Sequence, residues 1–266
     1  MNSLIEPEIQ FLPASLEYSD PILRLDNVSV RYRVPNERIT TLKEYAIRFL
    51  QQRIHYRDFW ALRGINLEIY RGEIFGIIGR NGAGKSTLLK VVSRVLAPTE
   101  GRIWIKGRIS PLLELGAGFH SELTGRENVF LNGTLLGHTR RDLESKMDGI
   151  LDFAELGNFI DAPLRTYSSG MVARLGFAVA TAWKPEILIL DEVLAVGDEV
   201  FRAKCQSRMQ DFRTKGTTTL LVTHDMNTIL ALCTRAAWLH QGEVQAWGVA
   251  SEVVKTFRQA TSSKTG

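Results

Sequence analysis

Apolar residues recur along this chain at two spacings, and together they predict an α/β fold. Runs of strand length lie at Leu23–Tyr32, Ile65–Ile69, Ile74–Ile78, Ile187–Leu190 and Thr219–Val222, with two more near Ile103 and Ile109. Helical patterns lie at about Ser121–Trp183, Arg202–Arg213, Met226–Cys233 and Ser251–Gln259, and a hairpin is predicted to turn at Gln241–Gly242. We therefore expect one α/β domain over residues 23–259, with a helical subdomain at about 121–183.

The two ends of the chain are expected to lie outside this domain. Residues 1–22 are predicted to form a loosely ordered leader without the basic and apolar layout of a secretion signal, and residues 260–266 are too polar to pack. Within the helical subdomain, Thr124 with Glu127 and Thr139 with Asp142 have the spacing of capping boxes, so each pair should open a helix.

An insertion separates Tyr32 from Trp60, and its apolar residues recur at helical spacing. We predict a basic amphipathic helix over about 37–57. Its apolar positions are Ile39, Leu42, Ala46, Phe49 and Leu50, and its basic positions are Arg38, Lys43, Arg48 and Arg53. Such a stripe is typical either of a plain surface helix or of a helix at a membrane surface.

The segment GRNGAGKST, Gly79 to Thr87, predicts a phosphate-binding loop because it matches the pattern G-x-x-x-x-G-K-[ST] between a strand and a helix. The glycines at 79, 82 and 84 allow the backbone N–H groups to point at the phosphates. Lys85 reaches the β- and γ-phosphates, and Ser86 offers a hydroxyl to Mg²⁺. The helix from Lys85 to about Leu96 adds the positive end of its dipole.

Two further features point to the same chemistry. The strand Ile187–Leu190 delivers Asp191 and Glu192 to its carboxyl end, where α/β sheets bind ligands. Ser168, Ser169 and Gly170 open a helix, and hydroxyls with free N–H groups at a helix N-terminus form a second anion site. One copy of the chain cannot easily use both anion sites on one phosphate.

In this order, the motifs resemble those of ATP-binding-cassette (ABC) ATPases over about Leu23 to Phe257. GRNGAGKST resembles the Walker A loop, YSSGM the signature motif and ILILDE the Walker B strand. The resemblance implies a P-loop NTPase of ABC type, with a mixed-sheet nucleotide lobe, an antiparallel β subdomain and a helical subdomain. It also implies ATP and Mg²⁺ as cofactors.

The resemblance assigns roles residue by residue. Glu192, His224 and Lys85 are implied to be catalytic, with Glu192 orienting or deprotonating the attacking water and His224 sensing the γ-phosphate. Ser86, Asp191 and Glu114 are the candidate metal ligands. Glu114 stands where the family has a glutamine, so either it binds the metal more directly or the register there differs by one residue. The implied nucleotide contacts are Tyr32, Gly79, Asn81, Gly82, Ala83, Gly84, Lys85, Ser86, Thr87, Ser168, Ser169, Gly170 and Asp198.

Departures from the general family pattern indicate a subfamily. YSSGM, DEVLAVGD, ELGAGF and the insertion together resemble the ATPase subunits of bacterial polysaccharide exporters. This implies that two copies close head to tail on two ATP molecules and power the export of O-antigen, capsule or teichoic acid as a lipid-linked polysaccharide. The implied partner is an integral membrane permease, in two copies, at the cytoplasmic face of the inner membrane. Some relatives carry a carbohydrate-binding β-sandwich after the cassette; this chain ends too soon for one, so we expect a polymer without a recognised terminal cap, or a separate specificity subunit.

Composition agrees with a peripheral cassette. No apolar run approaches the roughly 18 residues that cross a bilayer, and two isolated cysteines indicate buried thiols rather than disulfides or zinc. The net charge of +4 leaves an alternative open, a non-transport ABC ATPase acting on nucleic acid. That class is expected to have a long coiled-coil insertion or tandem cassettes. The sequence has neither, so we expect no nucleic-acid partner.

Overall fold

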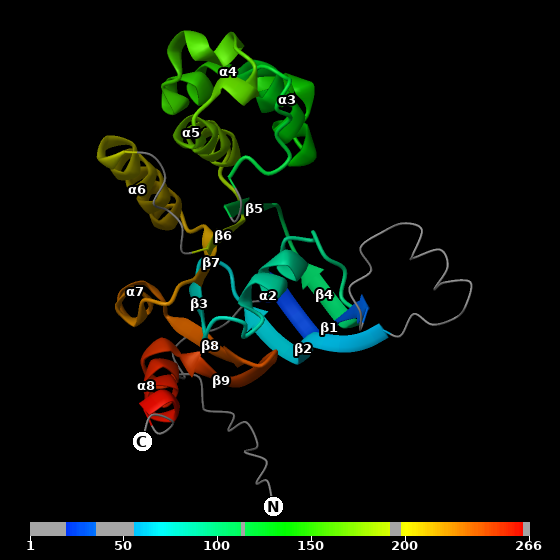
Figure 1. The fold of residues 1–266 in the computed structure, drawn as a ribbon. Coiled ribbons are helices and arrows are strands. Elements are labelled where there is room, and N and C mark those ends of the chain that lie inside the picture. The colour runs from blue at the N-terminus through cyan, green and yellow to red at the C-terminus, as the bar shows by residue number, and fades with distance from the viewer. Residues whose placement is uncertain (1–19, 36–55, 113–114, 192–197, 263–266) are drawn as a thin grey trace, which may run out of the picture.

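The computed structural model describes residues 20–35, 56–112, 115–191 and 198–262. Its strands form two sheets (Figure 1). The first is antiparallel, in the order β2-β1-β4, with β1 at Leu23–Pro35, β2 at Tyr56–Ile69 and β4 at Glu100–Ile105. The second has the order β5-β6-β7-β3-β8-β9 and is parallel except for the β8–β9 hairpin. Its strands are β3 (Ile74–Ile78), β5 (Ile109–Leu112), β6 (Ile187–Asp191), β7 (Thr218–Val222), β8 (Arg235–His240) and β9 (Glu243–Val249). The predicted mixed sheet and antiparallel β subdomain are confirmed.

The helices divide into a separate helical subdomain, which stands beyond β5 in Figure 1, and helices that lie beside the sheets. In the helical subdomain lie α3 (Gly125–Leu135), α4 (Arg140–Ala154), two short 3₁₀ turns (Gly157–Asp161 and Leu164–Thr166) and α5 (Ser169–Ala180). The others are α2 (Lys85–Val92), α6 (Glu199–Thr214), α7 (Met226–Leu232) and α8 (Ala250–Ser262). Within the described ranges, no helix combines the length and the apolar character that a bilayer span requires.

The mixed sheet is buried on both faces because its central strands alternate their apolar side chains between two cores. Ile187 and Ile189 of β6 join the core shared with α2 and the antiparallel sheet, whereas Leu188 and Leu190 join the core shared with α5 and α6. This explains why β6 reads as a continuous apolar run in the sequence. Such a strand holds its carboxyl end in a fixed position.

The capping boxes form as the sequence predicts. The Thr124 side chain accepts the Glu127 N–H, and Glu127 accepts the Thr124 N–H in return at 2.8 Å. Thr139 and Asp142 make the same reciprocal pair at the start of α4. Both acids carry lowered pKa values, because the N–H or hydroxyl that each accepts stabilises its charged form.

Several predicted boundaries are wrong. The helix after the glycine-rich loop ends at Val92 instead of about Leu96, because Arg94 takes a left-handed conformation (φ 60°) that stops it. Helix α8 continues to Ser262, into the predicted tail, with the Thr261 hydroxyl donating to the Phe257 carbonyl at 2.9 Å. Ile22, assigned to the leader, is fully buried and donates its N–H to Ile69.

The insertion begins and ends as strand. Val34 pairs with Arg57 and Pro35 with Tyr56, so the β1–β2 hairpin extends past the predicted strand end, and residues 56 and 57 of the predicted helix belong to β2. The remainder of that predicted basic helix lies outside the described residues, as do residues 1–19 of the leader.

Candidate functional site

The glycine-rich loop from Gly79 to Gly84 joins β3 to α2 through backbone conformations that favour glycine. Gly79, Gly82 and Gly84 have φ values of 155°, 78° and 105°. A Cβ on Gly79 would lie 2.3 Å from the Leu239 carbonyl oxygen, and one on Gly84 would lie 2.7 Å from the Ala61 oxygen. The loop is therefore pressed against β8 and β2 at two points, where only glycine fits.

Polar groups converge inside this loop. The Lys85 ammonium donates to the Gly79 carbonyl at 2.7 Å and to the Arg80 carbonyl at 3.1 Å, so it lies across the mouth of the loop. Gly84 provides no side-chain cap for α2, which leaves the first turn of the helix to offer backbone N–H groups to an anion. The Ala83 carbonyl accepts the Gly242 N–H at 2.9 Å, which fixes the loop to the β8–β9 turn. A phosphate chain fits this cradle of N–H groups and one cation.

The exposed polar side chains of the loop lie around its rim. Asn81 and Ser86 are exposed and Thr87 is partly exposed, whereas Ala83 is buried at 5% exposure. Ala83 therefore packs beneath the loop, and its backbone N–H donates to the Arg80 carbonyl at 3.1 Å, so its predicted contact with the nucleotide stays a prediction. Ser86 also lines the edge of a cleft of about 530 Å³ between α2 and the helical subdomain.

The carboxyl ends of β6, β7 and β3 lie in one row beside this loop. Asp191 is aligned with Val222, and Val222 with Ile77, across adjacent parallel strands. His224 lies two residues past Val222, the end of β7, and is exposed. Asp225 holds that turn in place, since it caps α7 by accepting the N–H groups of Asn227 and Thr228. The structure thus brings the backbone of Asp191 and the residue His224 to the same sheet edge as Lys85.

A divalent cation at this edge would find oxygen ligands of the type that Mg²⁺ prefers. The predicted ligands are the Ser86 hydroxyl and the Asp191 carboxylate, and their binding of Mg²⁺ stays a prediction. Within the described ranges, no cluster of three or more His, Cys, Asp or Glu residues forms a ready-made metal site. Glu192 and Glu114 lie outside the described residues, and the backbone alone is described for Asp191.

The second predicted anion site belongs to a different layer of the molecule. Ser168 caps α5 by accepting the Met171 N–H at 3.2 Å, and Ser168 and Ser169 are exposed while Gly170 is half-buried. Figure 1 shows α5 in the helical subdomain, whereas the glycine-rich loop lies at the sheets. The structure does not gather these two anion sites into one pocket of a single chain.

Asp198 is engaged by protein groups. Its Oδ1 accepts the Phe201 N–H at 2.9 Å as the N-cap of α6, and its Oδ2 accepts from Arg174 at 2.5 Å. The Phe201 N–H, followed by the Arg174 guanidinium, lowers the pKa of this carboxyl. The predicted nucleotide contact of Asp198 stays a prediction, and its observed contacts are structural.

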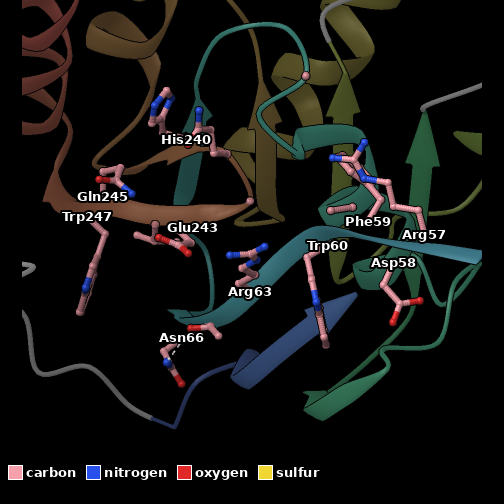
Figure 2. A pocket seen from close by; sticks show the side chains of 16 residues that line it. Arg57, Asp58, Phe59, Trp60, Arg63, Asn66, His240, Glu243, Gln245 and Trp247 are labelled. Carbon is pink, nitrogen blue, oxygen red and sulfur yellow. Dashed lines mark hydrogen bonds between the residues drawn. The ribbon is translucent and has the colours of Figure 1, made fainter. Parts of the chain in front are cut away.

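Tyr32, one of the implied nucleotide contacts, has an aromatic neighbour that the sequence did not indicate. Tyr32 is aligned with Phe59 across the β1–β2 hairpin, so both side chains share one face, and their exposed fractions are 37% and 58%. Phe59 lines a pocket of about 1190 Å³ that reaches Gly82 of the loop, and Figure 2 shows it on the opposite face of β2 from Trp60. The position of Phe59 opposite Tyr32 could have indicated this role. That position depends on the register of β1 and β2, which the sequence alone did not determine.

A family model for the ABC transporter matches residues 62–195 of this chain. The chain belongs to the ABC transporter family. It is 50% identical over 250 residues to the O-antigen export system ATP-binding protein RfbB of Myxococcus xanthus, covering 92% of this chain and 57% of that protein. It is 42% identical to the protein of the same name from Klebsiella pneumoniae, and the match covers 91% of this chain and 99% of that protein. It is 49% identical to the teichoic acids export ATP-binding protein TagH of Lactococcus lactis, and the match covers 76% of this chain and 43% of that protein.

Solved structures confirm that the fold is that of an ABC cassette. The chain resembles the ATP-binding cassette MJ0796, whose dimeric post-hydrolysis state was solved with ADP and Pi, with a TM-score of 0.64 at 24% identity, covering 86% of this chain and 98% of that one. A second ATP-binding subunit of an ABC transporter matches with a TM-score of 0.66 at 23% identity, covering 89% and 93%. The predicted ABC type of fold is therefore confirmed. The cassette spans little more than half the length of its Myxococcus relative.

Proposed function

We propose that this cassette is the ATP-hydrolysing subunit of a bacterial exporter of lipid-linked polysaccharide of the O-antigen, capsule or teichoic acid type. The observation that carries the proposal is the row of strand ends at β6, β7 and β3, which brings the backbone of Asp191, His224 and the loop bearing Lys85 to one edge. The relatives named for O-antigen and teichoic acid export support the substrate class. None of the relatives named above has a name that refers to nucleic acid, which weighs against that alternative.

The chain's own residues would divide the work of phosphoryl transfer. The loop N–H groups and Lys85 would bind and orient the phosphates. Ser86 and Asp191 would hold Mg²⁺, which supplies charge neutralisation at the phosphates. Glu192 would take a proton from the attacking water or orient it, and His224 would contact the terminal phosphate from the end of β7. Tyr32 and Phe59 offer an aromatic face for the base.

Each site would be shared between two copies of the cassette. Ser168, Ser169 and Gly170 lie on a different layer from the glycine-rich loop, and their exposed hydroxyls and helix end suit a phosphate held by another molecule. Two copies arranged head to tail would then place this surface of each copy on the nucleotide of the other. The dimeric form of the MJ0796 cassette supports this arrangement.

The membrane partner would be a separate permease, present in two copies, with the cassette bound at the cytoplasmic face of the inner membrane. The names of the relatives as ATP-binding proteins of export systems support this assignment. The basic residues predicted between Tyr32 and Trp60 would meet lipid phosphates or the pyrophosphate of the lipid-linked polymer.

Complementation in a strain that lacks the gene tests the proposal. Wild-type chain should restore surface polysaccharide, whereas Lys85→Ala should leave lipid-linked polymer inside the cell. Leu230→Ala, at an exposed position of α7 away from the glycine-rich loop, is a matched control that should restore export. The proposal would be contradicted if the deletion strain still carried normal surface polysaccharide. It would also be contradicted if the deletion impaired DNA repair or translation and left export intact.

A further inference from the structure

The pocket of about 1190 Å³ beside the glycine-rich loop extends well past the end that Phe59 and Gly82 line. It follows a groove between β2, the outer strand of the antiparallel sheet, and the β8–β9 hairpin. The Arg63 N–H closes the floor of this groove by donating to the Gly242 carbonyl at 2.8 Å. The volume exceeds the roughly 300–1,000 Å³ of most small-molecule sites. Of the lining residues, only Gly82 is among the predicted nucleotide contacts, so most of the groove has no ligand assigned to it.

Two tryptophans line the groove at widely separated positions (Figure 2). Trp60 projects from β2 and Trp247 from β9, and Figure 2 shows Arg63 and Glu243 between them. Both rings are half-buried. A guanidinium lies over each ring, that of Arg31 at 5.4 Å from the centre of Trp60 and that of Arg235 at 5.2 Å from the centre of Trp247. The two rings are therefore held in place as flat apolar surfaces, and a ligand that touches both must be extended.

The polar side chains of the groove offer both donors and acceptors. Arg63 carries five N–H donors, the Glu243 carboxylate accepts, and the Gln245 amide does both. Within the ranges that the structure describes, none of these three side chains forms a hydrogen bond or an ion pair with another protein group. Asn66 differs, because its amide accepts the Asn27 N–H at 2.8 Å and donates to the Gly64 carbonyl at 3.0 Å. The first three side chains thus keep hydrogen-bonding capacity for a ligand.

The charge of the groove favours a neutral ligand. Its charged lining residues are two arginines, Arg57 and Arg63, and two acids, Asp58 and Glu243. A polymer of phosphates would require an excess of cations. The electron-rich face of an aromatic ring instead attracts the weakly positive C–H groups on one side of a sugar ring. Each sugar hydroxyl both donates and accepts a hydrogen bond, which suits neighbouring groups of both kinds.

We propose that this groove is a binding site for a neutral oligosaccharide segment. Trp60 and Trp247 stack on sugar rings, and Arg63, Glu243 and Gln245 bind their hydroxyls. This inference rests on the proposed function for the source of the sugar, which is the polymer that the exporter carries. The cassette would then contact the polymer through its sugars, separately from the lipid and pyrophosphate at the polymer's end.

The test measures sugar binding by the full-length chain. The probe is the surface polysaccharide of the producing strain, freed of lipid and phosphate and cleaved to short oligosaccharides, and calorimetric titration gives its Kd. Wild type should bind it saturably, and saturating ATP should change this Kd by no more than about twofold, because the groove shares only Gly82 with the predicted nucleotide contacts. Trp60→Ala should weaken binding by about fivefold or more, since one stacking surface is lost.

Trp104→Ala is the matched control. Trp104 of β4 is 44% exposed and has the Arg24 guanidinium 5.7 Å from its ring centre, but it does not line the groove. Its Kd for the oligosaccharides should stay within about twofold of wild type. If Trp60→Ala does not fold, Arg63→Ala with Glu243→Ala replaces it, because both side chains are exposed and neither is bonded to the rest of the described protein.

Three results would overturn the inference: no saturable binding by wild type, an equal loss in Trp104→Ala, or displacement of the sugar by ATP, which would make the groove part of the nucleotide site. Complementation separates this inference from the proposed function. A wild-type chain that restores export but binds no sugar shows that only the inference is wrong. A deletion strain that exports normally removes the proposed function, and the source of the sugar with it.

Discussion

The buried ion pair between Glu73 and Arg235 gives a prediction whose magnitude follows from the structure. Arg235 Nη1 lies 3.1 Å from Glu73 Oε1, and the side chains are 2% and 8% exposed. The guanidinium carbon also lies 5.2 to 5.4 Å from the ring centres of Tyr70, Phe75 and Trp247. Through these contacts, Arg235 at the start of β8 binds Glu73, the residue before β3. Strand β3 leads into the glycine-rich loop.

Arg235→Met would leave the Glu73 carboxylate buried without its cation. Breaking a buried pair by removing one partner costs about 3–5 kcal/mol. For a domain of this size, where about 1 kcal/mol corresponds to roughly 2–4 °C, the melting temperature should fall by about 6–20 °C. Adding Glu73→Gln should recover most of this loss, because the neutral amide avoids the buried charge and still accepts the Tyr70 N–H.

The loss should depend on pH in a defined direction. Burial raises the pKa of Glu73 above its ordinary value, and Arg235 opposes that rise. Without Arg235 the pKa of the folded state rises further. A carboxyl whose folded pKa is raised favours the folded state below its unfolded pKa, about 4.3, and this contribution is lost as pH rises through the folded pKa. The destabilisation by Arg235→Met should therefore shrink as pH is lowered from neutral toward 5.

Urea unfolding of wild type, both single variants and the double variant, followed by tryptophan fluorescence, measures the free energies. Trp247 stacks on Arg235 and reports locally. A cost for Arg235→Met below about 1 kcal/mol, or one that does not change with pH, would refute the reasoning, because a buried carboxylate without its partner should be both costly and titratable.

Three further predictions concern hydrolysis, the loop and the membrane. Glu192→Gln should keep ATP binding and lose turnover because an amide cannot accept the proton; near-wild-type ATPase rates would remove Glu192 from its role. In the nucleotide-free protein, Gly82→Ala should cost only about 1–2 kcal/mol of backbone strain, whereas Gly79→Ala should lower the melting temperature more, since its Cβ would meet the Leu239 oxygen at 2.3 Å; equal shifts would contradict this. Arg48→Glu with Arg53→Glu should reduce polymer export while leaving ATPase activity and melting unchanged, and early melting would instead make that segment structural.

The parts of the site that could be predicted from the sequence are those set by neighbouring residues. The glycine-rich loop, the Ser168 cap and the two capping boxes each depend on a short run of residues, and each formed as expected. The apolar run of β6 likewise specified a strand buried on both faces.

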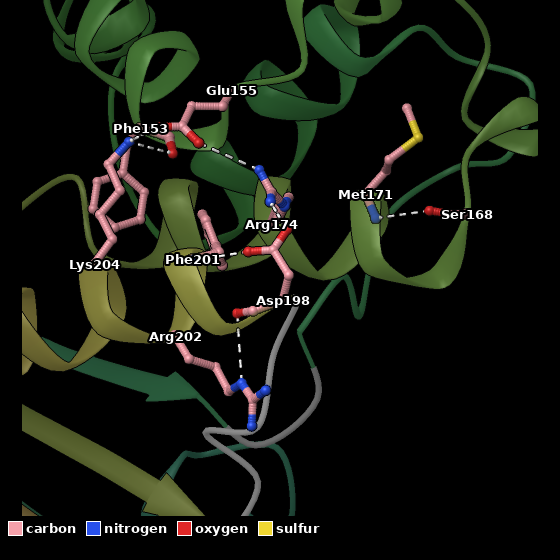
Figure 3. Close-up of polar contacts among 9 residues, drawn as sticks. All are labelled: Phe153, Glu155, Ser168, Met171, Arg174, Asp198, Phe201, Arg202 and Lys204. Carbon is pink, nitrogen blue, oxygen red and sulfur yellow. Dashed lines mark hydrogen bonds and ion pairs between the residues drawn. The ribbon is translucent and has the colours of Figure 1, made fainter.

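Features that depend on register or on long-range packing could not be predicted. Phe59 shares a face of the hairpin with Tyr32 only because the two strands pair in this register across the insertion. The Arg174 contact with Asp198 (Figure 3) joins two helices that are separated in the sequence by β6, and nothing in the spacing of these residues indicates it. The length of α2 was set by the left-handed conformation of Arg94. Glycine usually occupies such a position at a helix end, so an arginine there gave no indication of it.

Mixing two inactive variants tests the central claim, an ATP site shared between two copies, most directly. Lys85→Ala damages the glycine-rich loop and Gly170→Asp damages the end of α5, so neither variant alone should hydrolyse ATP. A heterodimer of the two contains one undamaged site, built from the wild-type loop of one copy and the wild-type α5 of the other. ATPase activity should recover in part and should rise with the fraction of heterodimer, which pull-down of differently tagged copies measures. Heterodimers that form and show no activity at any mixing ratio would contradict the claim.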